Sequence, residues 1–238
     1  MSNDKQRTKN GDGKAKVLIV DDHPIVRQGL SELINHEKDL AVCAQAEDAT
    51  EAMIAIKSAK PDVAVVDISL KEKNGVELIK DIKAQYPNLP VLVLSMHDES
   101  LYAERALRAG ARGYIMKHEA TDKVVTGIRA VLDGQVFVSD KMAARMVYKL
   151  VGGGASSESA IDNLSDRELE VFNLIGRGLG TRQIAEKLYL SIKTIETYRS
   201  HIKEKLNLAS AGELLQYAIQ WVNSQDKSVP DSQLQRRD

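Results

Sequence analysis

The sequence predicts an α/β domain built on a five-stranded parallel sheet, followed by a small all-α domain. Short apolar, β-branched runs alternate five times with segments of helical spacing in residues 14–137, which is typical of βα units. Residues 163–225 show only helical spacing. Between the two parts, the glycine- and serine-rich residues 152–159 have the composition of a flexible joint.

The expected strands are mostly apolar throughout, as strands covered by helices on both faces of a sheet must be. They are residues 16–22, 40–46, 62–67, 90–96 and 113–117. The spacing between them predicts helices over 25–34, 49–56, 76–82 and 101–109, and a last helix over 121–132. Pro24 fits the first turn of the first of these helices, where its missing N–H costs nothing.

The second domain opens on a helix-capping pattern. Ser165 and Glu168 have the spacing of a capping box, in which each side chain accepts a hydrogen bond from the other's backbone N–H. Further helices are expected over 181–188, 192–206 and 211–222, and the first two have helix-turn-helix spacing. We assign 138–162 to the linker, within which 141–151 allows a short helix, and expect 1–13 and 226–238 to be disordered.

Composition excludes several classes of protein. The chain has 33 basic and 34 acidic side chains, so no overall positive field indicates nucleic acid, but residues 177–206 carry seven basic and three acidic ones, a local charge of +4. The single cysteine, Cys43, excludes an intramolecular disulfide and a multi-cysteine zinc site, which suits a reducing cytoplasm. The polar start has neither a secretory signal nor a membrane anchor.

Polar side chains stand where the predicted strands end. Asp21 and Asp22 end the first strand, Asp67 the third, Ser95 the fourth and Lys117 the fifth. The carboxyl ends of parallel strands converge at one edge of the sheet. Three carboxylates placed together need a cation or a proton between them, and Mg²⁺ prefers oxygen ligands and a phosphate. The lysine and the serine hydroxyl would supply a charge and a donor to phosphoryl oxygens.

Residues 16–134 resemble the flavodoxin-like receiver domain of two-component response regulators, whose phosphorylation site has these five residue types at these strand ends. The resemblance implies that Asp67 is the phosphoacceptor, and that it attacks the phosphohistidine of a sensor histidine kinase. It further implies that Mg²⁺ is held by Asp22, by Asp67, by the backbone carbonyl of Ser69 and, through water, by Asp21.

The resemblance also implies a switch, and the sequence departs from the family pattern in the loop after Asp67. Ser95 and Tyr114 are similar to the switch pair, in which the hydroxyl moves toward the phosphoryl group and the ring turns inward. Lys71 stands where the family usually has proline, which implies a more mobile loop. Ser69 and His97 occupy positions that tune dephosphorylation in the family.

Three histidines flank the acidic pocket without metal-ligand spacing, and we expect all three to be ordinary surface residues. They are His23, His97 and His118.

Residues 164–222 resemble the LuxR-type helix-turn-helix domain of the NarL/FixJ class of response regulators. The resemblance implies that Glu196, Thr197 and Ser200 read bases. It implies contacts to the DNA backbone from Arg182, Lys193, Thr194, Tyr198 and Lys205. The family often has lysine at 196 and histidine at 198. We therefore expect an altered sequence preference, because a glutamate can accept a hydrogen bond from a cytosine amino group.

We interpret the chain as a cytoplasmic transcription factor in which phosphorylation of Asp67 frees the helix-turn-helix to form a homodimer on double-stranded DNA. Its only chemistry would be its own phosphorylation and dephosphorylation. Two alternatives remain open. DNA binding indifferent to phosphodonor and magnesium would indicate a constitutive DNA-binding protein whose receiver is a dimerisation module. Turnover of a small phosphoester would indicate a metal-dependent phosphohydrolase. In the last helix, Leu214, Leu215 and Ile219 belong to the core or to a dimer face, which the sequence does not separate.

Overall fold

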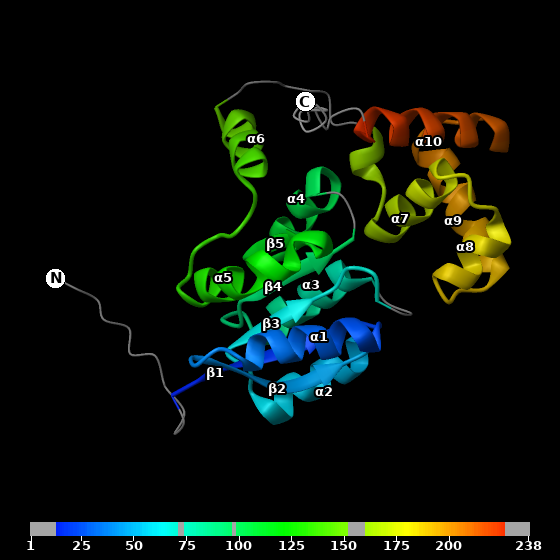
Figure 1. Ribbon diagram of the computed structural model, residues 1–238. Helices are drawn as coiled ribbons and strands as arrows, with labels where there is room; N and C mark the ends of the chain where they lie inside the picture. The colour runs from blue at the N-terminus through cyan, green and yellow to red at the C-terminus, as the bar shows by residue number, and fades with distance from the viewer. Residues whose placement is uncertain (1–12, 71–73, 97–98, 152–159, 227–238) are drawn as a thin grey trace, which may run out of the picture. The chain divides into compact units, whose positions relative to one another are not determined.

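The computed structural model describes residues 13–70, 74–96, 99–151 and 160–226 (Figure 1). The chain divides into two compact units between Gly154 and Ala155. The predicted arm, joint and tail lie outside the described residues, apart from Gly13 and Asp226 at their edges. None of the described helices has both the length and the apolar character needed to cross a membrane.

The first unit contains a five-stranded parallel sheet with the order β2-β1-β3-β4-β5 (Figure 1). Its strands are β1 (Ala15–Val20), β2 (Leu40–Ala46), β3 (Val63–Val66), β4 (Val91–Ser95) and β5 (Gly113–Met116). In the register of the central strand, Val65 pairs with Ile19 on one side and with Leu92 on the other. All four residues of β3 are buried, because helices cover both faces of the sheet.

Helices connect these strands and cover the sheet. They are α1 (Pro24–Asn35), α2 (Ala49–Ala59), α3 (Gly75–Gln85), α4 (Glu99–Ala109), η1 (Lys117–Glu119), α5 (Ala120–Leu132) and α6 (Asp140–Leu150). The first and fifth α-helices share one face of the sheet, where Ile34 and Ile128 belong to one apolar core with Val65. The second, third and fourth α-helices lie on the other face (Figure 1).

Helix ends show where the hydrophobic pattern underestimates helix length. Both α2 and α3 continue three residues beyond the predicted ends, because a final polar turn carries no apolar period. Asp48 and Asn74 cap the starts of these two helices, and each side chain accepts a hydrogen bond of 2.8 Å from a backbone N–H. Lys60, in the left-handed conformation at φ 49°, ends α2.

Part of the predicted linker is helical and belongs to the first unit. Ser139 caps α6 by accepting a hydrogen bond of 3.1 Å from the backbone N–H of Met142. The backbone N–H and the hydroxyl of Ser139 both donate to the carboxylate of Glu99, the first residue of α4. The start of α6 is therefore fixed to the first turn of α4.

All the secondary-structure elements described in the second unit are helices, which completes the predicted fold class and confirms it. Its helices are η2 (Ala160–Asn163), α7 (Asp166–Gly176), α8 (Thr181–Lys187), α9 (Ile192–Lys205) and α10 (Ala211–Asp226). The predicted capping box is confirmed, since Ser165 N–H donates to Glu168 Oε2 at 2.7 Å and Glu168 N–H donates to Ser165 Oγ at 3.3 Å. Phe172 packs against Trp221, with ring centroids 5.3 Å apart.

The structure separates the apolar residues of α10 that the sequence left undivided. Leu214 and Ala218 are fully buried, whereas Leu215 and Ile219 are 42% and 38% exposed. The first pair forms part of the core of the second unit, and the second pair lies on its surface.

Candidate functional site

The acidic pocket forms where parallel strands end at the same edge of the sheet. Asp21 follows β1, Asp67 follows β3 and Lys117 follows β5, while Ser95 is the last residue of β4. Since these strands are neighbours in the sheet, side chains far apart in the sequence meet. Oxygen atoms of Asp21, Asp22 and Asp67 lie within 4.8 Å of one another, together with a ring nitrogen of His23.

Lys117 joins two of these carboxylates. Its Nζ lies 2.6 Å from Asp21 Oδ2 and 2.7 Å from Asp67 Oδ2, and its side chain is only 10% exposed. Burial lowers the pKa of Lys117, but the two carboxylates raise it more, so the net pKa is above its ordinary value. The lysine is therefore a permanent positive charge against the predicted phosphoacceptor.

The pKa shift of Lys117 favours its charged form, whereas the pKa shift of Asp67 favours its neutral form. Burial raises its pKa most, Lys117 lowers it and Asp21 raises it, with the result that the pKa of Asp67 rises to about 6. The backbone N–H of Ser69 donates to Asp67 Oδ1 at 3.2 Å. One lysine thus does not offset the cost of burying this carboxylate beside a second one.

The remaining oxygen atoms of the pocket fit a hard divalent cation. Asp22 Oδ1 is buried in the pocket. It lies 2.6 Å from Nδ1 of His23, which is charged only when protonated. Three carboxylates facing a single lysine form the oxygen-rich, negative donor set that Mg²⁺ prefers. The ligation by Asp21, Asp22, Asp67 and the Ser69 carbonyl stays a prediction.

His23 is closer to the pocket than the sequence indicates. We expected an ordinary surface histidine, and its side chain is 63% exposed, but Nδ1 lies against Asp22 and 3.3 Å from Asp21 Oδ1. Its backbone N–H also donates to Asp21 Oδ1 at 2.9 Å. Its place directly after the acidic pair was the available signal, since the turn into α1 brings the ring back over both carboxylates.

The predicted switch residues are buried on neighbouring strands. Ser95 is 0% exposed and Tyr114 is 2% exposed. Ser95 pairs with Met116, two residues beyond Tyr114, so Ser95 and Tyr114 point to the same face of the sheet. Their roles stay predictions, and Lys71 and His97 lie outside the described residues.

The second unit presents the predicted DNA-binding residues mainly on α9. Ile195 and Ile202 on this helix are fully buried. The other faces carry Lys193, Thr194, Glu196, Thr197, Tyr198, Ser200 and Lys205, and Arg182 is exposed on α8. This is the arrangement of an amphipathic helix that packs on one side and can enter a major groove on the other.

Several of these side chains have partners within the unit. The hydroxyls of Thr197 and Ser200 donate to carbonyls one turn back on α9, both at 3.1 Å. Lys205 Nζ lies 2.6 Å from Oε2 of Glu168, the capping-box glutamate of α7. Sequence spacing did not indicate this ion pair, because it joins residues on two different helices. A DNA phosphate would have to compete with Glu168 for Lys205.

Comparison with known proteins identifies the family. Residues 17–129 match the response regulator receiver domain, and residues 162–218 match the bacterial regulatory proteins of the luxR family. The oxygen regulatory protein NreC of Staphylococcus epidermidis is 36% identical over 210 residues, which cover 86% of this chain and 96% of that protein. NreC of Staphylococcus carnosus is 37% identical over 209 residues, with the same coverage.

Solved structures of response regulators are similar along the chain. RcsB of Salmonella typhimurium is 27% identical with a TM-score of 0.61, covering 87% of this chain and 98% of RcsB. A LuxR-family response regulator of Aurantimonas is 35% identical with a TM-score of 0.54, covering 58% of this chain and 99% of that one. The chain therefore belongs to the NarL/FixJ class of two-component response regulators, which are DNA-binding regulators of transcription. The predicted family and function are confirmed at this level.

Proposed function

We propose that a sensor histidine kinase transfers a phosphoryl group to Asp67, and that the phosphorylated chain binds double-stranded DNA as a homodimer. The observation that carries this proposal is the position of Lys117, which lies against both Asp21 and Asp67 at the carboxyl edge of the sheet. A buried lysine that bridges two carboxylates supplies fixed positive charge where a phosphoryl group would gain negative charge.

This geometry supports the following steps of phosphoryl transfer. The Asp67 carboxylate attacks the phosphorus of the kinase's phosphohistidine, the P–N bond breaks, and the imidazole leaves with the bonding electrons. Lys117 faces Oδ2 of Asp67 and can move its hydrogen bond to a phosphoryl oxygen. Asp21, Asp22, Asp67 and the Ser69 carbonyl would hold Mg²⁺. When bound, Mg²⁺ neutralises charge on the phosphoryl oxygens.

Activation is proposed to proceed through Ser95 and Tyr114. The aspartyl phosphate offers acceptor oxygens that the free carboxylate lacks, so the Ser95 hydroxyl gains a partner and the receiver shifts toward a second conformation. Phosphorylation can shift this balance only by interacting differently with the two conformations. In this family we expect the shift to free the helix-turn-helix. We expect the chain to catalyse no reaction other than its own phosphorylation and dephosphorylation.

The proposal that the chain binds DNA is supported by the exposed polar faces of α9 and by the DNA complexes of the similar protein RcsB. One RcsB structure, 28% identical with a TM-score of 0.57, is described as bound to the promoter rprA in the presence of the phosphomimetic BeF₃⁻. Another, 28% identical with a TM-score of 0.52, is described as two RcsB dimers bound to two parallel DNAs. The exposed Leu215 and Ile219 would suit a dimer contact. A site of action on DNA would place the chain in the cytoplasm.

The experiment compares the full chain with Asp67→Asn, and with Asp122→Asn as a control on the exposed start of α5. Each protein is incubated with acetyl phosphate and magnesium, and its intact mass and its affinity for a selected DNA sequence are measured. We expect the parent and the control to gain the mass of one phosphoryl group and to bind DNA more tightly, and Asp67→Asn to do neither. An equal gain in DNA affinity by Asp67→Asn would overturn the proposal and favour the constitutive alternative. Sustained hydrolysis of a small phosphoester would favour the phosphohydrolase.

A further inference from the structure

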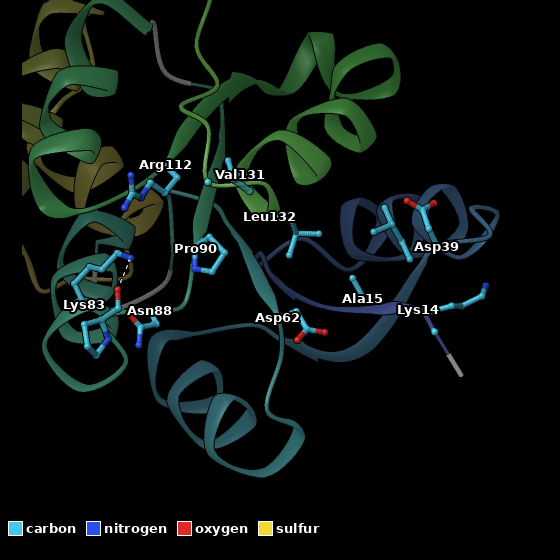
Figure 2. A pocket seen from close by; sticks show the side chains of 14 residues that line it. Lys14, Ala15, Asp39, Asp62, Lys83, Asn88, Pro90, Arg112, Val131 and Leu132 are labelled. Carbon is cyan, nitrogen blue, oxygen red and sulfur yellow. Dashed lines mark hydrogen bonds between the residues drawn. The ribbon is translucent and has the colours of Figure 1, made fainter. Parts of the chain in front are cut away.

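A cavity of about 450 Å³ lies at the amino ends of the strands, at the opposite edge of the sheet from Asp67 (Figure 2). Its lining includes a residue at the start of each strand or directly before it: Ala15, Leu40, Asp62, Pro90 and Arg112. Binding sites for small molecules commonly enclose about 300–1,000 Å³. The phosphorylation chemistry uses none of the residues in this lining.

The two carboxylates of the lining already have hydrogen-bond donors. Asp39 receives hydrogen bonds from Nε and Nη2 of Arg129, at 2.9 Å and 2.7 Å. Asp62 Oδ2 accepts a hydrogen bond of 2.7 Å from the backbone N–H of Lys16. These interactions leave one oxygen of Asp62 free of hydrogen bonds with the described residues.

The three cations of the lining have no carboxylate partner among the described residues. Lys83 Nζ donates to the carbonyls of Pro87 and Leu89, at 3.2 Å and 2.9 Å. Lys14 Nζ donates to a backbone carbonyl at 2.9 Å. The Arg112 guanidinium makes no hydrogen bond or ion pair within the part of the chain that the structure describes. Burial and the nearby charge of Arg112 both lower the pKa of Lys83. Lys83 and Arg112 are therefore two neighbouring cations of the lining without a carboxylate partner among the described residues.

Three polar groups of the lining could bind a ligand together: Lys83, Arg112 and the free oxygen of Asp62. Figure 2 shows Lys83 and Arg112 on one side of Pro90, and Asp62 and Leu132 on the other. The first two groups would hold an anion, and two cations match the charge of a phosphate better than that of a carboxylate. The apolar residues would contact the carbon skeleton. The free oxygen of Asp62 would accept a hydrogen bond from a hydroxyl or amino group.

We propose that this cavity binds a small phosphomonoester, with the phosphate between Lys83 and Arg112 and a hydroxyl or amino group on Asp62. Such a ligand would stabilise the receiver at the edge of the sheet that carries no phosphorylation chemistry. The proposal is independent of phosphoryl transfer to Asp67, so either can fail without the other.

The test uses ribose 5-phosphate as the probe and the full chain carrying Asp67→Asn, without magnesium, so that the acidic pocket takes up no phosphate. Calorimetric titration measures its Kd for this protein and for the further variants Lys83→Gln and Arg112→Gln. Arg108→Gln serves as the control, because Arg108 is exposed and pairs with Glu104 on α4, away from the cavity. Circular dichroism checks that each variant is folded.

We expect ribose 5-phosphate to bind the parent with a Kd of about 1 mM or tighter. In Lys83→Gln and in Arg112→Gln its Kd should be at least about tenfold weaker, because each variant loses one charged hydrogen bond. Arg108→Gln should bind as the parent does. Ribose should not bind, and inorganic phosphate should bind more weakly than ribose 5-phosphate. The proposal is overturned if ribose 5-phosphate does not bind, or if its Kd is the same in Arg112→Gln and Lys83→Gln as in the parent.

Discussion

Gly75 offers the sharpest test of how the fold positions Asp67, the proposed phosphoacceptor. It is the first residue of α3, and its N–H donates to the carbonyl of Ile68 at 2.8 Å. A Cβ added to Gly75 would lie 2.1 Å from the carbonyl oxygen of Asp67 and 2.7 Å from Cα of Ile68. Glycine is needed here because the start of α3 touches the backbone of the residue that is proposed to be phosphorylated.

The size of the disturbance follows from these distances. An ordinary contact begins at 3.4 Å, so Gly75→Ala requires the backbone of Asp67 or the start of α3 to move by about 1.3 Å. Overpacking of this kind typically costs about 1–3 kcal/mol of unfolding free energy. A displacement of about 1 Å at a reacting group can slow a reaction by roughly 10²-fold. We therefore expect Gly75→Ala to lose both stability and phosphorylation rate.

The assay measures urea unfolding and the rate at which acetyl phosphate and magnesium phosphorylate the full chain. Gly29→Ala is the matched control, because Gly29 lies inside α1 and a Cβ there would meet no atom within 4 Å. We expect this control to be phosphorylated at the parent rate and to gain about 0.5–1 kcal/mol from its higher helix propensity. If Gly75→Ala were as stable and as quickly phosphorylated as the parent, the reasoning about this close approach would be wrong.

Three further predictions concern the charges and the core. Lys117→Met leaves buried carboxylates without their lysine and should lose about 3–5 kcal/mol at pH 7. Without magnesium, urea unfolding should show the variant regaining stability relative to the parent from pH 7 to pH 5, because loss of Lys117 raises the pKa of Asp67 further and protonation then stabilises the variant more than the parent; an equal deficit at both pH values would contradict this. Burial raises the pKa of Glu168, but Lys205 and Ser165 lower it more, so its pKa is below the ordinary value. The contribution of the Glu168 carboxylate to stability is therefore lost as the pH falls below about 4.3. Glu168→Gln should therefore flatten the acid dependence of unfolding followed by the single tryptophan, and an unchanged slope would count against this ion pair. Leu214→Ala should cost about 2–5 kcal/mol of unfolding free energy and Leu215→Ala less than about 0.5 kcal/mol, whereas equal losses would contradict their different burial.

Much of the fold and of the acidic pocket could be predicted because they depend on local patterns and on one topological rule. Apolar runs of four to seven residues, separated by helical spacing, indicate a parallel sheet, and polar residues at strand ends must then share one edge. This is why Asp21, Asp67 and Lys117 could be grouped before any contact was known. The capping box at Ser165 is equally local and was predicted for the same reason.

The sequence by itself determined which residues end the strands, which faces of the helices are apolar and where the local excess of positive charge lies. Only the tertiary structure decided that Lys117 bridges Asp21 and Asp67, that Lys205 pairs with Glu168, and that Lys83 and Arg112 line one cavity at the amino ends of the strands. These contacts join side chains from different segments. Periodicity determines the face on which a residue lies, but the packing of whole elements determines which residue of another element it meets.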